Sequence, residues 1–139
     1  MIIYVDENMP QVLAQGFNLL QKPENIKLKA KDPIEVISII DEFGRGAEDE
    51  EWIPKAGKQG SCIITQDYNI SRIKHQQKLC RQYQLGMFYF RPPSKSGFSY
   101  WDMVQLMVKH WPAICKIATK EKKPFAYRIT SRSSKPERM

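Results

Sequence analysis

The chain has 139 residues, of which 42% are hydrophobic and 27% charged, which is the ordinary composition of one globular domain. Lysine and arginine number 22 against 15 aspartates and glutamates, and the net charge of +7 favours an anionic partner such as nucleic acid. No apolar run is long enough to span a membrane, and the start MIIYVDENMP lacks the basic region of a signal peptide. We therefore expect a cytoplasmic protein that has no membrane partner.

The charge is distributed unevenly along the chain. Residues 119–139 carry seven basic and two acidic side chains, whereas residues 41–51 carry six acidic side chains and one arginine. We predict one domain over residues 1–130, followed by a basic, flexible tail over residues 131–139. The three cysteines are odd in number and far apart in sequence, which favours reduced structural thiols over disulfides or a zinc site.

The first third of the chain predicts strand, helix and strand. Residues 2–5 are apolar and mostly β-branched, and they end at an acidic residue, as buried strands often do. Asn8 and Pro10 are typical of a helix start, and an apolar face continues to about residue 21. A polar loop over residues 22–33 and a second strand over residues 34–40 follow.

The middle of the chain repeats this alternation. Asp49 is placed to cap a helix that ends near Lys58, and residues 62–65 form a third buried strand. Ser71 is placed to cap a helix over residues 72–85, and residues 87–90 form a fourth strand.

The last part predicts an apolar helix or two over residues 100–118, interrupted at Pro112, and a final edge strand over residues 125–129. Strands that alternate with helices indicate an α/β fold with a mostly parallel sheet and helices on both faces.

Three acidic residues lie where such a fold would bring them together. Asp6 and Asp67 directly follow buried strands, and Asp49 opens the helix that leads into the strand before Asp67. Ligands of open α/β sheets bind outside the carboxyl ends of the strands, so we expect the three side chains to share one crevice. Clustered carboxylates favour a hard divalent cation such as Mg²⁺ or Mn²⁺, and such an ion is suited to phosphodiester hydrolysis.

Each of these acids also has an ordinary structural interpretation. Asp49 is a normal helix cap, and Asp6 and Asp67 are common turn residues. Their joint placement is what predicts a site.

Two motifs resemble the PIN-like nucleases and, among them, the VapC-type toxins. The motifs are VDENMP at residues 5–10 and DEEWIPKAGKQGSCIITQD at residues 49–67. The downstream strand MFYF and the helix that contains His110, Trp111 and Pro112 are also similar to one branch of these toxins. The positions that match the order and spacing of the family are Asp49, Trp52, Ala56, Gly60, Thr65 and Asp67.

The resemblance implies a three-layer PIN-like fold, with a central, twisted, mostly parallel sheet of four to five strands flanked by helices. It implies a Mg²⁺- or Mn²⁺-dependent endoribonuclease, acting as the toxin of a toxin–antitoxin pair. Its partners would be an RNA substrate, a cognate antitoxin and a second copy in a homodimer. Asp6, Asp49 and Asp67 match the catalytic, metal-binding acids of the family.

The acidic set departs from the family pattern in two ways. We find no clear match for the additional acid that PIN domains carry between the first two aspartates, and Asn69 stands where related sequences often have an acid. Glu7, Glu50 and Asn69 are further candidates for metal ligands. The alternative interpretation is a catalytically impaired PIN-like module that binds RNA or a protein, and a third is an interaction domain whose acidic stretch at 41–51 contacts a basic partner.

Several residues near the predicted crevice are candidates for substrate binding. Thr65 is expected to orient the Asp67 loop through its hydroxyl group. The basic side chains after the third and fourth strands are suited to bind phosphates, or alternatively form a solvated face. The substrate-binding candidates are Thr65, Arg72, Lys74, Arg91 and Lys95.

Overall fold

The computed structural model describes residues 1–27 and 32–139 of the chain. The predicted loop at 22–33 falls partly on residues 28–31, which lie outside the described residues. The strands are β1 (Ile2–Val5), β2 (Glu35–Ser38), β3 (Cys62–Gln66), β4 (Gly86–Phe90), β5 (Phe125–Ile129) and β6 (Glu137–Arg138). The helices are α1 (Gln11–Lys27), α2 (Ile39–Phe43), α3 (Asp49–Lys58), α4 (Ile70–Gln82) and α5 (Tyr100–Lys120).

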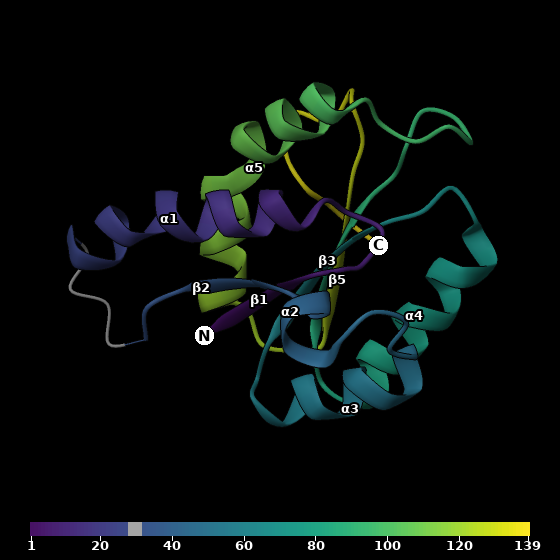
Figure 1. The fold of residues 1–139 in the computed structure, drawn as a ribbon, viewed down its shortest axis with the longest axis horizontal. Helices are drawn as coiled ribbons and strands as arrows, with labels where there is room; N and C mark the ends of the chain where they lie inside the picture. The colour runs from purple at the N-terminus through teal and green to yellow at the C-terminus, as the bar shows by residue number, and fades with distance from the viewer. Residues whose placement is uncertain (28–31) are drawn as a thin grey trace.

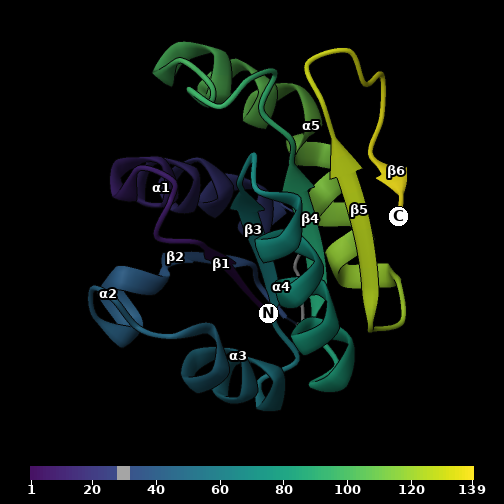
Figure 2. The ribbon, with the colours of Figure 1, turned by 90° about the vertical axis from the view of Figure 1, so that its right-hand side faces the viewer.

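The strands form one sheet in the order β2-β1-β3-β4-β5-β6. The pairs from β2 to β5 are all parallel, and the two-residue strand β6 is antiparallel to its neighbour. Figure 2 shows β3, β4 and β5 side by side, with β6 at the outer edge. The mixed α/β fold with a mostly parallel sheet is confirmed, and β6 is one strand more than the four to five predicted.

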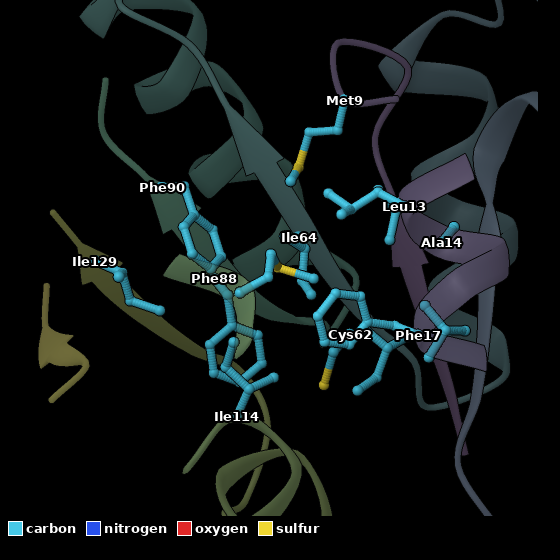
Figure 3. Close-up of a cluster of buried hydrophobic side chains, with 14 of the residues drawn as sticks. Met9, Leu13, Ala14, Phe17, Cys62, Ile64, Phe88, Phe90, Ile114 and Ile129 are labelled. Carbon is cyan, nitrogen blue, oxygen red and sulfur yellow. The ribbon is translucent and has the colours of Figure 1, made fainter. Parts of the chain in front are cut away.

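Helices cover both faces of the sheet, so the fold has three layers. Figure 1 shows α1 and α5 on one side of the strands and α2, α3 and α4 on the other. Each strand supplies alternate residues to the two sides, because successive side chains of a strand point to opposite faces. In β3, for example, Cys62 and Ile64 join the α1–α5 core, whereas Ile63 joins the core under α3 and α4. Figure 3 shows the first of these cores, with side chains from α1, α5 and the strands directed toward one another.

Two helices continue through internal prolines, and one of these, Pro112, was predicted as an interruption. Pro23 lies inside α1, which extends to Lys27 rather than to about residue 21, and Pro112 lies inside α5. Helix α5 is continuous from Tyr100 to Lys120, and its axis changes direction along its length (Figure 1). A proline removes one backbone hydrogen bond and bends a helix, but buried contacts on both sides of Pro112 keep α5 in place.

The C-terminal residues are folded, although the sequence predicted a flexible tail over 131–139. Ser133 is buried, its hydroxyl accepts a hydrogen bond from the Thr130 amide at 3.0 Å, and its carbonyl accepts one from Lys109 Nζ at 2.9 Å. The amide of Met139 donates to the carbonyl of Ala126 at 2.9 Å. Backbone pairing with β5 and the buried serine therefore hold this segment against the domain.

In the part of the chain that the structure describes, no helix is both long and apolar enough to cross a lipid bilayer. Cys62, Cys80 and Cys115 are free thiols, and burial raises the pKa of Cys62 to about 12.

Candidate active site

The predicted acidic residues meet at the topological switch point of the sheet, where successive strands begin to be added on the other side of β1. Strand β1 lies between β2 and β3, so the chain leaves β1 toward one side and later returns to its other side. Side chains that follow two such neighbouring strands face a shared crevice at the carboxyl edge of the sheet. Asp6 follows β1, Asp67 follows β3, and Asp49 is the first residue of α3, which leads into β3.

Asp6 is the most enclosed of the three, with 1% of its surface exposed. Its Oδ2 accepts hydrogen bonds from Thr65 Oγ1 at 2.7 Å and from Gln76 Nε2 at 2.8 Å. Its Oδ1 accepts a hydrogen bond from the amide of Glu7 at 2.7 Å. These donors offset the cost of burying a carboxylate and fix the orientation of Asp6.

Asp49 is held by its own helix and by α4. Its Oδ1 accepts hydrogen bonds from the indole of Trp52 at 3.1 Å and from Gln76 Nε2 at 3.4 Å. The sequence predicted that Asp49 caps the helix, but Glu48 is the N-cap, and the Asp49 carboxylate faces Trp52 and Gln76 instead. Burial and the neighbouring charge of Asp6 raise the pKa of Asp49, whereas Arg72, Trp52 and Gln76 act in the opposite direction.

Asp67 lies in the turn between β3 and α4. Its Oδ1 accepts a hydrogen bond from the amide of Asn69 at 2.8 Å, and its carbonyl accepts one from the hydroxyl of Tyr89 at 2.7 Å. The ring of Tyr89 is buried under the sheet edge, so strand β4 fixes the position of this turn.

The guanidinium group of Arg72 lies among the three carboxylates. Its Nη2 is 3.4 Å from Asp6 Oδ2 and 4.0 Å from Asp49 Oδ2, and its Nη1 is 3.2 Å from Asp67 Oδ2. Arg72 is one of the candidates that the sequence offered for phosphate binding, and in this structure its ion pairs are with the acids. Arg72 brings the first turn of α4 against the site and compensates part of the repulsion between the carboxylates.

The chemistry of the three side chains fits a hard cation, because carboxylate oxygens are the ligands that Mg²⁺ and Mn²⁺ prefer. Their present arrangement does not complete a site. Over residues 1–27 and 32–139, no group of three histidine, cysteine, aspartate or glutamate side chains is arranged to hold a metal ion. Arg72 occupies the space between the acids, so the same oxygens would serve a metal only after the guanidinium moves away.

The other suggested metal ligands have different partners. Both carboxylate oxygens of Glu7 accept a hydrogen bond from the amide of Gly46 at 3.1 Å. This contact holds the segment between α2 and α3 against the turn that follows β1. Glu50 pairs with His75 at 2.5 Å on the exposed side of α3 and α4. Asn69 caps α4 through hydrogen bonds from the amides of Ser71 and Arg72, so the cap is Asn69 rather than the predicted Ser71.

The substrate-binding candidates are spread over the same edge. Thr65 is fully buried and donates to Asp6, so it orients Asp6 rather than the Asp67 loop. Lys74 is exposed on α4, and Lys95 is exposed in the loop before α5. Arg91 follows β4, and its amide donates to the carbonyl of Ile129 at 2.9 Å, which joins the ends of β4 and β5.

Sequence reasoning did not identify Gln76 as part of the site. Gln76 is completely buried, and its amide nitrogen contacts both Asp6 and Asp49. It lies four residues after Arg72, and residues at this spacing share one face of a helix. That spacing, directly after the Thr-Gln-Asp motif, was the signal in the sequence from which Gln76 could have been predicted.

Asn8 was also missed as a positioning residue. Hydrogen bonds between Asn8 and Gln66 join the β1–α1 turn to the β3–α4 turn.

The comparisons with known proteins agree with this geometry. A family described as "PIN like domain" matches residues 1–92, which is about two-thirds of the chain. The chain belongs to the PIN-like domain family. Searches of the curated proteins and of the solved structures give no significant match. The family match includes β1, α3, β3, α4 and β4, and so the whole acidic site of this PIN-like domain, but not α5, β5 or β6.

Proposed function

We propose that this PIN-like protein is an endoribonuclease that hydrolyses RNA with the help of Mg²⁺ or Mn²⁺. The observation that carries the proposal is the convergence of Asp6, Asp49 and Asp67 at the sheet switch point of a chain in the PIN-like family. When bound between these acids, the cation would supply Lewis acidity toward the scissile phosphate.

The chain's own residues would have separate tasks in this reaction. Thr65 and Gln76 hold the Asp6 carboxylate in one orientation, and Trp52 does the same for Asp49. Arg72 is one-third exposed, so its guanidinium is free to turn from the acids toward an incoming phosphate. A guanidinium binds phosphate with two parallel hydrogen bonds, which offsets the loss of its carboxylate partners.

The test is RNA cleavage with Mg²⁺ or Mn²⁺ by the wild type and by Asp6→Asn and Asp67→Asn. Loss of a metal-binding acid is expected to reduce the rate by at least one hundredfold. Asp32→Asn is the matched control, because Asp32 is exposed at the opposite edge of the sheet, where it pairs with the N-terminal amine. Equal cleavage by the wild type and both site variants after rigorous purification would refute the proposal.

A second candidate function is a catalytically impaired module that binds RNA or a protein. The observation that favours it is Arg72, which takes the place of a cation among the acids. Calorimetry distinguishes the two functions: RNA binding without any Mn²⁺ binding is expected only of the impaired module.

We further propose that the protein is the toxin of a toxin–antitoxin pair and forms a homodimer. The support is a set of exposed apolar side chains on α1 and α5, the two helices that cover one face of the sheet. It includes Leu19 and Leu20 of α1, and Trp101 and Val108 of α5, each more than half exposed. Uncovered apolar side chains on neighbouring helices of one layer are typical of an interaction surface. Light scattering of the purified protein, alone and with the product of a neighbouring gene, tests both partners.

A further inference from the structure

A basic groove lies on the same sheet edge as the acidic site. It has a volume of about 440 Å³ and lies at the ends of β4 and β5. Arg91, Arg128 and Arg132 line it, together with Tyr68, the residue directly after Asp67. The groove therefore begins beside the acidic site and extends away from it across the sheet.

The charge of this groove is mostly uncompensated. Its lining contains three arginines and no acidic side chain. Arg128 pairs with Glu137 at 3.6 Å, with both groups about half exposed, whereas no carboxylate lies within 4.0 Å of Arg91 or Arg132 in the described parts of the chain. Guanidinium groups in this setting favour phosphate, which they bind through charge-assisted, two-pronged hydrogen bonds.

The groove is also ordered. Arg132 belongs to a compact turn in which the Thr130 amide donates to Ser133 Oγ at 3.0 Å and the Arg132 amide donates to Thr130 Oγ1 at 3.3 Å. Ser133 is buried at the base of this turn. Pro92, which is buried, and Pro93 also line the groove, and they restrict the backbone that follows β4. The arginines therefore project from fixed backbone positions, which lowers the entropic cost of binding.

Tyr68 gives the groove an aromatic surface next to the acids. Tyr68 is 39% exposed, unlike Tyr89, which is buried below the same turn. An exposed ring between a basic groove and a catalytic centre is suited to stack on an unpaired base. A base inside a duplex is already stacked on both sides, so this feature favours single-stranded nucleic acid.

We propose that this groove binds the phosphate backbone of single-stranded RNA beside the scissile bond, with a base stacked on Tyr68. The proposal rests on the proposed function for the identity of the ligand as RNA. It assigns substrate binding to a C-terminal segment, because Arg128 and Arg132 lie outside residues 1–92, which match the family.

The experiment measures the binding of a fluorescent 12-nucleotide single-stranded RNA by anisotropy, in EDTA so that no cleavage occurs. The groove variant is Arg91→Gln/Arg128→Gln/Arg132→Gln. Its charge-matched control is Lys58→Gln/Lys116→Gln/Lys120→Gln, which removes three exposed positive charges from the ends of α3 and α5, near the opposite edge of the sheet. Arg91→Gln/Arg132→Gln is measured as well, because it keeps the Arg128–Glu137 pair and therefore the β5–β6 pairing.

We expect the groove variants to bind the RNA at least tenfold more weakly than the control. The slope of log affinity against log salt is expected to fall by about 0.7 for each lost phosphate contact. Tyr68→Ala is expected to weaken binding by about fivefold or more with an unchanged salt slope, since stacking involves no ion release.

Three outcomes would overturn the inference. In the first, the groove variants match the control in RNA affinity and in the salt dependence of that affinity. In the second, a duplex of the same sequence binds as tightly as the single strand. In the third, polyglutamate of equal charge displaces the labelled RNA as well as unlabelled RNA does. The last result would assign the groove to an acidic protein. Binding is measured without metal, so the two proposals can fail separately. If the wild type binds RNA but does not cleave it, and the groove variants bind it more weakly, the proposed catalysis is refuted and the groove is not.

Discussion

Arg72 is the residue that decides the charge of the acidic site. Three carboxylates surround its guanidinium, and one of them, Asp6, is almost completely buried. Without a cation, such a cluster would be destabilised by desolvation and by repulsion between its members. Arg72 therefore stabilises the metal-free protein, and any divalent ion must compete with it for the same oxygens.

Arg72→Gln is expected to have opposite effects on stability and on metal affinity. Loss of the guanidinium should lower the free energy of unfolding by about 1–3 kcal/mol in EDTA, between the values for exposed and buried ion pairs. The freed carboxylates should bind Mn²⁺ at least tenfold more tightly, so Mn²⁺ should raise the melting temperature of the variant more than that of the wild type.

Calorimetry and thermal unfolding measure these two effects of Arg72→Gln. Arg81→Gln is the control, because Arg81 is an exposed arginine on the same helix but at its other end. Unchanged Mn²⁺ affinity in Arg72→Gln would show that the guanidinium does not compete with the metal.

The sequence was sufficient to predict which acidic residues come together, but not which side chains form hydrogen bonds and ion pairs with them. Asp6 and Asp67 follow from a rule of sheet geometry that depends on where strands end, and Asp49 follows from the start of the helix that leads into β3. The partners of a side chain depend on rotamers and on the packing of neighbouring helices. For this reason the sequence did not indicate the ion pairs of Arg72 with the acids and missed Gln76, although both side chains lie on the face of α4 that is turned toward the acids.

The helices and strands were predicted to different degrees of accuracy. The buried strands β1, β3 and β4 were predicted within one residue of their ends, because short runs of β-branched and aromatic residues are typical of them. Pro112 suggested a break in α5 because local propensity opposes a proline inside a helix, but packing of the flanking apolar residues outweighs that cost. The two-residue strand β6 has no periodicity from which it could be predicted.

The packing of α3 against the end of α4 predicts the effect of a methyl group at Gly57. A Cβ there would lie 2.3 Å from the carbonyl oxygen of Tyr83 and 3.0 Å from Leu85 Cδ1. Backbone cannot yield as a flexible side chain does, so Gly57→Ala should lower the free energy of unfolding by about 2–3 kcal/mol. Urea unfolding measures the change.

Gly16 in α1 offers a matched control for Gly57→Ala. Among the described residues, and apart from the backbone of α1 itself, a Cβ at Gly16 would meet no atom within 4 Å. Alanine is the better helix former, so Gly16→Ala should raise the stability by about 0.5–1 kcal/mol. Equal effects of the two substitutions would mean that helix propensity, rather than the contact between α3 and α4, governs both positions.

Considered as a whole, the molecule places opposite charges along one edge of its sheet. The acidic site lies at the ends of β1 and β3, and the basic groove lies at the ends of β4 and β5. Composition gave only the net charge of +7, and the uneven distribution suggested a basic tail. The fold brings part of that tail, Arg132, onto the sheet edge, so its charge belongs to the groove rather than to a mobile end.

His110 links the folded C-terminal segment to the pH dependence of stability. Its ring is buried in α5, where it contacts the backbone of Ser133, the base of the turn that carries Arg132. Burial and the charge of Lys109 lower the pKa of His110 below its ordinary value of 6.5, and the contact with Ser133 only partly opposes them. The unfolded chain therefore binds a proton more readily than the folded chain does, and acid favours unfolding.

The free energy of unfolding of the wild type is therefore expected to include a contribution that is present above about pH 6.5 and is lost as the pH falls through the lowered pKa of His110. His110→Gln, which stays neutral, should lack this contribution. Urea unfolding of both proteins in EDTA between pH 7.5 and 5 should show the wild type losing more stability than the variant. The two proteins share the same carboxylates, so the difference between their unfolding free energies excludes the titration of those groups. If the two plots of unfolding free energy against pH are parallel, His110 has the same pKa in the folded and the unfolded chain. Since Ser133 lies against this ring, the protection factors of the amides around residues 130–133, which are corrected for the intrinsic exchange rate at each pH, should fall at low pH in the wild type before they do in the variant.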